Sequence, residues 1–470
     1  MKRYSILRSW DPVQDKSLRA IVKLIILLIT LFVTYWILPT SRAAHFEREG
    51  TLQLPILKVL IPVIVFTFTI IISILLVQKQ SVIPKLKFVN SVYFPNVSFG
   101  IFVVVPSLLS VFGYNQIHTL YYKVFRISHL DPTFGDLRTI LYGISCNSVN
   151  ELGDLIDCDP RSSDTIWNYP TFLLKLRALN VSIQALPFWV ALSTLVTIIT
   201  IHIISKQISS ESRALLSIAV CSPPMILCYE RMNFDITILS LLILSAFLLE
   251  RFHCSILSTF FSFVLISCAS SLKFYATPVF FVAFLYVIKV NRKSAVLGLF
   301  ISIVTILFLF QDLLDLSEYV GKDLRGSVGF SVLVSLLSGS ETANYEFYSL
   351  AFFAGVVVIL FTALIMRKVS FADEVIKTSP VVIFPLFAFL VTWFSSSSYY
   401  YRLLLLVFVL PFLYQLKDKM AIWVSMVALC SFFYSPSSLG FVLNIFILPM
   451  VVLGLKIIVS NLKFHLSGRM

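Results

Sequence analysis

The chain has 470 residues, of which 58% are hydrophobic and only 13% are charged, and its mean hydropathy is +0.92. Soluble proteins carry about 25% charged residues, so this composition excludes a soluble multidomain, disordered or fibrous protein. We therefore expect an all-α polytopic membrane protein, because continuous apolar runs fit helices and lack the two-residue alternation of a β-barrel.

Candidate membrane spans follow the whole chain. A helix needs roughly 20 mostly apolar residues to cross the hydrocarbon, and several runs are shorter, so we expect about 11–14 transmembrane helices. The runs lie at 20–38, 56–77, 96–113, 184–204, 214–228, 236–250, 255–271, 276–290, 294–311, 347–366, 379–396, 402–416, 421–436 and 440–458.

Three regions are expected. Residues 1–95 form a basic N-terminus with two accessory spans, 96–416 form a transmembrane core, and 417–470 form C-terminal spans and a tail. Helix–helix links are usually 2–8 residues, and two links of the core, 114–183 and 312–346, are far longer. Extramembrane chemistry is therefore expected in these two loops.

Lys and Arg set the orientation. With a cytoplasmic N-terminus, most of them fall in cytoplasmic connections, as the positive-inside rule requires. Both termini are then cytoplasmic if there are fourteen spans, and both long loops are on the outer face. The net charge of +13 is thus a topology signal rather than a nucleic-acid footprint, so we expect no nucleic-acid partner.

The first long loop is expected to carry two surface helices, at 114–126 and 136–149, which mix apolar and polar residues at helical spacing. In the same loop, Cys146 and Cys158 either form a disulfide in an oxidising compartment or remain free thiols. The motifs of metalloproteases, P-loop proteins and serine hydrolases are absent from the sequence, and we expect no metal and no cofactor.

Charged residues at the outer ends of the spans need a reason, since a charge in the bilayer costs roughly 2.5–3.5 kcal/mol. They fall in four short segments. These are DPTFGDLR (131–138) with Asp131, Asp136 and Arg138; YERMNFD (229–235) with Glu230, Arg231, Asn233 and Asp235; SLKFYATP (271–278) with Lys273; and YYYRLL (399–404) with Tyr401 and Arg402.

Each segment has a structural interpretation. The tyrosines are typical of an interfacial belt, and Arg402 of a snorkelling anchor. Asp136 is also well placed to cap a helix. Together, however, cations from separate helix ends and a loop carboxylate on one face suit a site in which cations hold a phosphate and a carboxylate removes a proton.

These segments resemble those of the GT-C superfamily of membrane glycosyltransferases, particularly the bacterial polyprenyl-phosphate-sugar-dependent group that includes mannosyltransferases. The likeness covers roughly 96–416 and departs from the family pattern at Met232, where Gly is common. It implies that Asp136, or alternatively Asp131, is the catalytic base. It also implies that the donor phosphate and substrate are bound by Arg138, Glu230, Arg231, Asn233, Lys273, Tyr401 and Arg402.

The resemblance implies an inverting, metal-independent transfer from a polyprenyl-phosphate-linked sugar to a hydroxyl of a glycan, lipid or protein acceptor. The reaction would take place on the outer face of a bacterial inner membrane. Two other functions stay open, namely a flippase or transporter of lipid-linked glycans and a polysaccharide polymerase or ligase. A transporter is expected to show paired broken helices and polar residues near the midplane.

Overall fold

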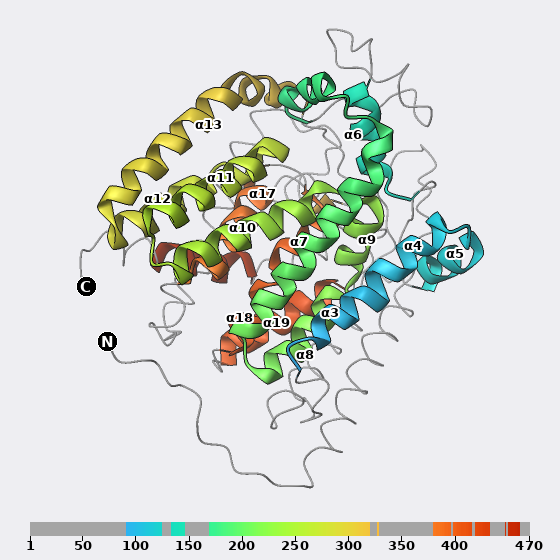
Figure 1. Cartoon of the computed structure of the whole chain (residues 1–470). Helices are drawn as coiled ribbons and strands as arrows, with labels where there is room; N and C mark the ends of the chain where they lie inside the picture. Colours follow the sequence, from blue (N-terminus) through green and yellow to red (C-terminus); the bar gives the residue numbers. More distant parts are fainter. Residues whose placement is uncertain are drawn as a thin grey trace, which may run out of the picture.

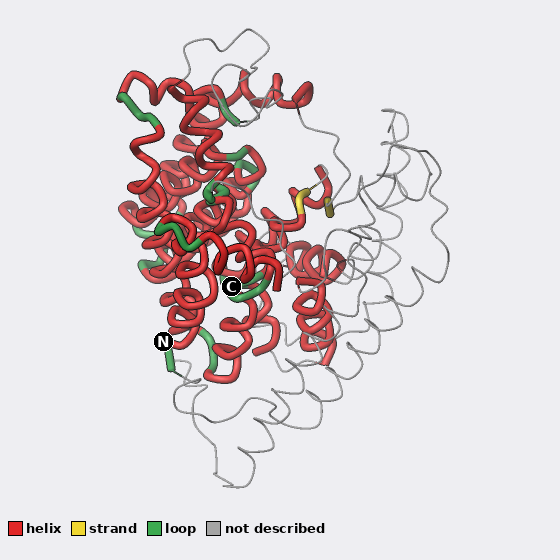
Figure 2. The backbone as a smooth tube through the Cα atoms, turned by 90° about the vertical axis from the view of Figure 1, so that its right-hand side faces the viewer, coloured by secondary structure: helices red, strands yellow, loops and turns green. Residues whose placement is uncertain are grey.

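The computed structural model describes residues 91–124, 133–145, 169–319, 327–328, 379–395, 398–415, 419–432, 447 and 450–460. This part of the chain is almost entirely helical, as the sequence predicts, with two very short strands at its margin (Figure 2). The first two expected spans, the span at 347–366, Asp131, Cys146 and Cys158 lie outside the described residues.

The first described helix is continuous through three segments, α3 (Phe94–Phe99), the π-helical η2 (Gly100–Val104) and α4 (Val105–Val111). Pro95 begins α3, where its missing N–H leaves no hydrogen bond unmade. Gly113, with φ of 85°, then turns the chain into α5 (Asn115–Val124). The hydroxyl groups of Tyr122 in α5 and Ser107 in α4 form a hydrogen bond of 2.9 Å.

Short helices cover one end of the molecule. The helix α6 spans Gly135–Ser145, and η3 (Thr171–Leu179) and η4 (Ile183–Ala185) are 3-10 helices that pack against it. Helices are present at the two places expected in the first long loop, as α5 and α6.

The central part of the chain folds as a series of helices joined by short links (Figure 1). The helix α10 lies in the middle and packs against α7, α11 and α17. The series consists of α7 (Leu186–Gln207), α8 (Ser210–Val220), α9 (Pro223–Arg231), α10 (Phe234–Arg251), α11 (Ile256–Leu272), η5 (Phe274–Ala276), α12 (Val279–Val290) and α13 (Arg292–Tyr319).

The later helices return to the same body, next to elements far away in sequence. The 3-10 helix η7 packs against α9 and α10, and α18 packs against α8. The strands β1 and β2 pair antiparallel, with Ser327 opposite Tyr399. These later elements are β1 (Ser327–Val328), α17 (Pro380–Ser395), β2 (Ser398–Tyr399), η7 (Tyr400–Leu406), α18 (Val409–Gln415) and α19 (Lys419–Phe432).

Within the residues that the structure describes, two helices are long and apolar enough to cross a membrane, Ile183–Gln207 and Arg292–Phe310. A third span is formed if α8 and α9 count as one, although they meet at an angle of 52°. The sequence predicts an unbroken run at 214–228, but the helix is interrupted at Cys221 and restarts at Pro223. Proline at the first turn of a helix is favoured, whereas inside a helix it removes a hydrogen bond.

Large apolar side chains are exposed on the outside of α7 and α13. On α13 the exposed positions include Phe300, Leu307 and Phe308, and on α7 they include Phe188 and Leu195. Exposed apolar faces of this size are unusual on a soluble protein and mark contact with lipid or with another protein. They agree with the membrane character that the composition indicates.

Candidate functional site

The junction between α9 and α10 gives the site its shape. Arg231 ends α9, and Met232 takes a left-handed conformation (φ 49°, ψ 47°) from which its N–H bonds back to Cys228 and Tyr229. Asn233 then begins α10 as its N-cap, and its side-chain oxygen accepts from the backbone N–H of Asp235 at 3.1 Å. The chain reverses over these few residues, so the polar side chains of the YERMNFD segment gather at one helix junction.

The start of α6 is fastened to this junction. The backbone N–H of Phe134, a residue with φ of 66°, donates to the carbonyl oxygen of Glu230 at 2.7 Å. Two residues later, Oδ2 of Asp136 accepts a hydrogen bond from Asn233 Nδ2 at 2.6 Å. Oδ1 of Asp136 lies 3.9 Å from Nη1 of Arg231, and both side chains are partly exposed. Asp136 therefore belongs to the first turn of α6 and faces the junction, rather than serving as the N-cap.

Lys273 reaches the same junction from α11. It is the C-cap of that helix and has an extended backbone (φ −154°, ψ 134°). Its Nζ donates to Oδ1 of Asn233 at 2.7 Å and lies 2.9 Å from Oδ1 of Asp235. The ammonium also lies 5.9 Å from the centre of the Tyr169 ring, within the range of a cation–π contact.

Asp235 is the centre of the charged group. Its carboxylate is fully buried, accepts a hydrogen bond from the hydroxyl of Tyr275 at 2.7 Å, and lies 3.7 Å from Nε of Arg402. The guanidinium of Arg402 also stacks over the Tyr275 ring, 5.6 Å from its centre. A buried carboxylate is costly unless it is paired and hydrogen-bonded. Lys273 and Tyr275 both act on Oδ1, whereas, among the described residues, Oδ2 accepts no hydrogen bond and is balanced only by the charge of Arg402, 3.7 Å away.

Five of the sequence-predicted site residues therefore meet in one cluster, which we call the junction cluster: Asp136, Arg231, Asn233, Lys273 and Arg402. They come from four elements, the start of α6, the α9–α10 junction, the end of α11 and η7. The structure thus brings residues from separate segments of the sequence together at one place.

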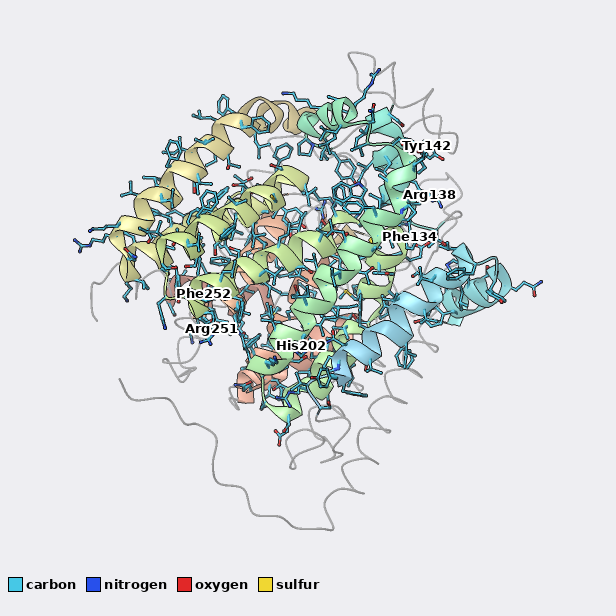
Figure 3. The ribbon with its side chains drawn as sticks, in the orientation of Figure 1. Phe134, Arg138, Tyr142, His202, Arg251 and Phe252 are labelled. Carbon is cyan, nitrogen blue, oxygen red and sulfur yellow. The ribbon has the colours of Figure 1, made fainter. Side chains whose placement is uncertain are left out.

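The other predicted residues lie differently. Glu230 is buried and contributes its backbone carbonyl, which holds Phe134. Arg138 lies on the α6 side of the body (Figure 3) and donates from Nε to the carbonyl oxygen of Thr133 at 2.8 Å. In the described part of the chain Arg138 forms no ion pair with the junction cluster. Tyr401 belongs to η7 but its side chain lies outside the described residues, as do Asp131, Cys146 and Cys158.

Three further residues join the junction cluster without having been assigned to the site from the sequence: Asp235, Tyr275 and Tyr169. Asp235 and Tyr275 stand in YERMNFD and SLKFYATP, two segments that the sequence already marks, and Tyr169 stands shortly before η3. Asp235 had the clearest signal, because it is a carboxylate in the first turn of an apolar helix. Such a position demands a cationic partner, and two cations were available in the neighbouring segments.

Tyr169 is a neutral hydrogen-bonding group at the edge of the junction cluster. Burial, together with the nearby negative charges of Asp136 and Asp235, raises the pKa of Tyr169 well above its usual value. Its ring packs edge-on against Phe234 at 6.0 Å between centres. The phenol therefore remains protonated and uncharged at any physiological pH.

The junction cluster has the chemistry of an anion site beside a carboxylate. Cationic side chains from three elements surround two carboxylates, and of these Asp136 is the one with an exposed fraction, at 19% of its side chain. Arg and Lys bind phosphate oxygens through charge-assisted hydrogen bonds, and a carboxylate at the same place can accept a proton. Among the described residues, no three His, Cys, Asp or Glu side chains are arranged to hold a metal ion.

Comparison with known proteins identifies no relative: no family model, no curated protein and no solved structure matches this chain.

Proposed function

We propose that the chain is an integral-membrane glycosyltransferase that moves a sugar from a polyprenyl-phosphate donor to an acceptor hydroxyl on the outer face of a bacterial inner membrane. One observation carries the proposal. The junction cluster places a partly exposed carboxylate, Asp136, 3.9 Å from Arg231 and, through the amide of Asn233, beside Lys273. The GT-C resemblance of the same four segments supports it independently.

The direction of α10 supports the proposed orientation of the helices, in which fourteen spans place both termini in the cytoplasm. Helix α10 starts at the junction cluster and ends at Arg251, and its 18 residues measure about 27 Å along the axis, close to the hydrocarbon thickness. Arg251 and Phe252 accordingly lie far from Phe134 and Arg138 in Figure 3. The basic residues at the ends of α7, α10 and α12 (Lys206, Arg251 and Lys289) then share the face opposite the junction cluster, as cytoplasmic residues do.

In the proposed reaction Asp136 takes the proton of the acceptor hydroxyl. The acceptor oxygen forms a bond to the anomeric carbon of the donor sugar, and the bond between that carbon and the phosphate oxygen breaks. The electron pair leaves with the polyprenyl phosphate, whose growing negative charge is offset by Arg231, Lys273 and Arg402. Asp235 does not react in this scheme, because it is buried and engaged by two of these cations.

The test uses the purified full chain in phospholipid vesicles with a panel of polyprenyl-phosphate hexoses and pentoses, radiolabelled in the sugar. Acceptors come from an extract of cell-envelope lipids and glycans. We expect at least one donor to lose its sugar to an acceptor. Asp136→Asn should lower that rate by about 100-fold or more, the usual contribution of a general base. Glu211→Gln in the first turn of α8 is the matched control and should keep full activity. The absence of transfer from every donor of the panel would contradict the proposal.

One observation favours transport as a second candidate. The helices α8 and α9 are separated by a break and a 52° bend, and α9 ends at Arg231 in the junction cluster. Discontinuous helices that end at a substrate site are typical of transporters. Vesicles holding a fluorescent lipid-linked glycan distinguish the two functions. Movement of the glycan between leaflets that is equal in the wild type and Asp136→Asn, without sugar transfer, would favour a transporter.

A further inference from the structure

The side-chain amide of Asn233 is held in a single orientation. Its Oδ1 faces two groups that only donate, the backbone N–H of Asp235 at 3.1 Å and the ammonium of Lys273 at 2.7 Å. This atom must therefore be the oxygen, since an NH₂ group there would meet two donors. The NH₂ group consequently points to Oδ2 of Asp136, 2.6 Å away.

Asn233 has little left to offer a ligand. Its side chain is 98% buried, with a relative exposure of 2%, whereas the side chain of Asp136 keeps an exposure of 19%. The amide oxygen already has two donors, and the amide nitrogen already serves the carboxylate. A substrate can therefore reach Asp136 without touching Asn233.

We infer that Asn233 is a positioning residue for Asp136, and not a ligand of the donor as its place in the sequence suggests. The inference rests on the proposed function, in which Asp136 is the base. Holding Oδ2 through an N–H donor fixes the plane of the carboxylate and leaves Oδ1, on the Arg231 side, for the acceptor proton. Because Lys273 binds the other end of the same amide, the orientation of the base is tied to a cation proposed to hold the phosphate.

Several charged or titratable groups face Asp136 from the elements around it, and any pH effect must be judged against them. The nearest cation is Arg231, and Arg138 on the same helix is turned to the carbonyl of Thr133. On η3, which packs against α6, Lys175 and Arg177 are exposed, and the Lys175 ammonium lies over the Phe308 ring. On the far side of the Asn233 amide lie Lys273, Asp235 and Arg402, and Tyr169 lies close enough for the charge of Asp136 to influence it.

The substitution Asn233→Asp isolates the bridge to Asp136. Aspartate is as good an N-cap as asparagine, and it keeps an acceptor for Lys273 and for the Asp235 N–H. What it loses is the donor toward Asp136, where two carboxylates would now meet and share a proton. We expect the acid limb of the pH–kcat profile to move up by about one unit or more. The KM for the donor should change less than about threefold. Asn233→Ala, which lacks both the cap and the bridge, serves as the reference for plain destabilisation, with a lower thermal transition.

The pH profiles and donor KM values of the same variants can also overturn the inference. If Asn233→Asp keeps the wild-type pH profile while Asp136→Asn is inactive, Asp136 remains the catalytic base and Asn233 is only a helix cap. A rise in donor KM with an unchanged pH profile would make Asn233 a substrate ligand instead.

A second readout does not need turnover. Infrared difference spectra of the full chain are recorded over a range of pH. The carboxylic-acid band of Asp136 is identified as the one that Asp136→Asn removes. It should appear at higher pH in Asn233→Asp than in the wild type. An unshifted band would overturn the inference whether or not the chain transfers sugar. A shifted band without any transfer would leave the positioning role in place and remove the proposed function.

Discussion

The ammonium of Lys273 lies 2.9 Å from Oδ1 of Asp235, an ion pair formed between the C-terminal end of α11 and the first turn of α10. The carboxylate has no exposed surface, and Arg402 approaches its other oxygen from η7. Three helix ends are thereby fixed to one another at the place where a phosphate is proposed to bind. The first prediction concerns this buried carboxylate.

Asp235→Asn should destabilise the protein and make it more responsive to anions. Removing one partner of a buried ion pair costs about 3–5 kcal/mol, because the remaining charge stays buried. Lys273 and Arg402 would then lack their carboxylate, so inorganic phosphate should raise the melting temperature of the variant more than that of the wild type. Thermal unfolding in detergent across a phosphate series measures both effects.

The matched control for this prediction is Glu250→Gln. Glu250 lies at the other end of α10 and accepts a hydrogen bond from Ser379 at 3.2 Å. We expect a smaller loss of stability and no added response to phosphate. Equal phosphate responses in the two variants would show that Asp235 does not hold the cations of the junction cluster.

Asp136 and Asp131 should differ in their effect on turnover. Asp136→Asn removes the carboxylate that faces Arg231 and Asn233, so we expect a loss of about 100-fold or more in kcat with donor binding retained. Asp131→Asn should stay within a fewfold of the wild type. The initial rate of sugar transfer in vesicles measures both, and the reverse ranking would move the base to Asp131.

At Met232, side-chain packing should contribute more to stability than the strain of the left-handed backbone costs. Its left-handed backbone costs a non-glycine residue about 1–2 kcal/mol, but its side chain is almost fully buried. Removing a buried Met side chain costs about 2–5 kcal/mol, which is the larger effect. We therefore expect Met232→Gly to be less stable than the wild type, despite its better backbone fit.

Met232→Ala separates the two contributions. It loses nearly the same side chain as Met232→Gly but keeps the left-handed strain, so its free energy of unfolding should be lower than that of the glycine variant by about 1 kcal/mol. Denaturant unfolding of the three proteins gives the ranking. A glycine variant more stable than the wild type would mean that the Met232 side chain does not contribute to the core.

Cysteine labelling tests the proposed topology. Arg177 on η3 and Phe252 after α10 are both exposed and belong to opposite ends of the helical body. In intact cells a membrane-impermeant maleimide should label Arg177→Cys and leave Phe252→Cys unlabelled until the membrane is opened. The wild type gives the background from native cysteines. Labelling of both positions from outside would invalidate the assignment of faces.

The sequence predicts the members of the junction cluster better than their contacts. The cost of charge near the membrane identifies the segments around Asp136, Arg231, Lys273 and Arg402, and their convergence follows once each segment ends a helix on the same face. The sequence does not predict that Asp235 would be the buried centre, because that depends on which way the α9–α10 junction turns. The left-handed conformation of Met232 decides this turn, and it is set by tertiary packing.

Other features of the helices follow from local signals in the sequence. The start of a new helix at Pro223 could have been predicted, because Ser222-Pro223-Pro224 is a typical helix N-terminus within the run at 214–228. The orientation of Arg138 could also have been predicted, because the sequence already indicates a helix over 136–149. Its neighbour Asp136 faces the junction, and a residue two positions further along a helix points away from that face, toward Thr133.

The wide separation of the cluster in sequence has a consequence for biogenesis. Asn233 meets Asp136 across 97 residues, Lys273 reaches Asn233 only 40 residues later, and Arg402 arrives after most of the chain has been synthesised. A nascent chain therefore inserts α10 with Asp235 at its leading end before either cation has emerged from the ribosome. Until the segment of η7 has been synthesised, the junction cluster is incomplete, and the proposed activity should be absent while the later helices are still being inserted.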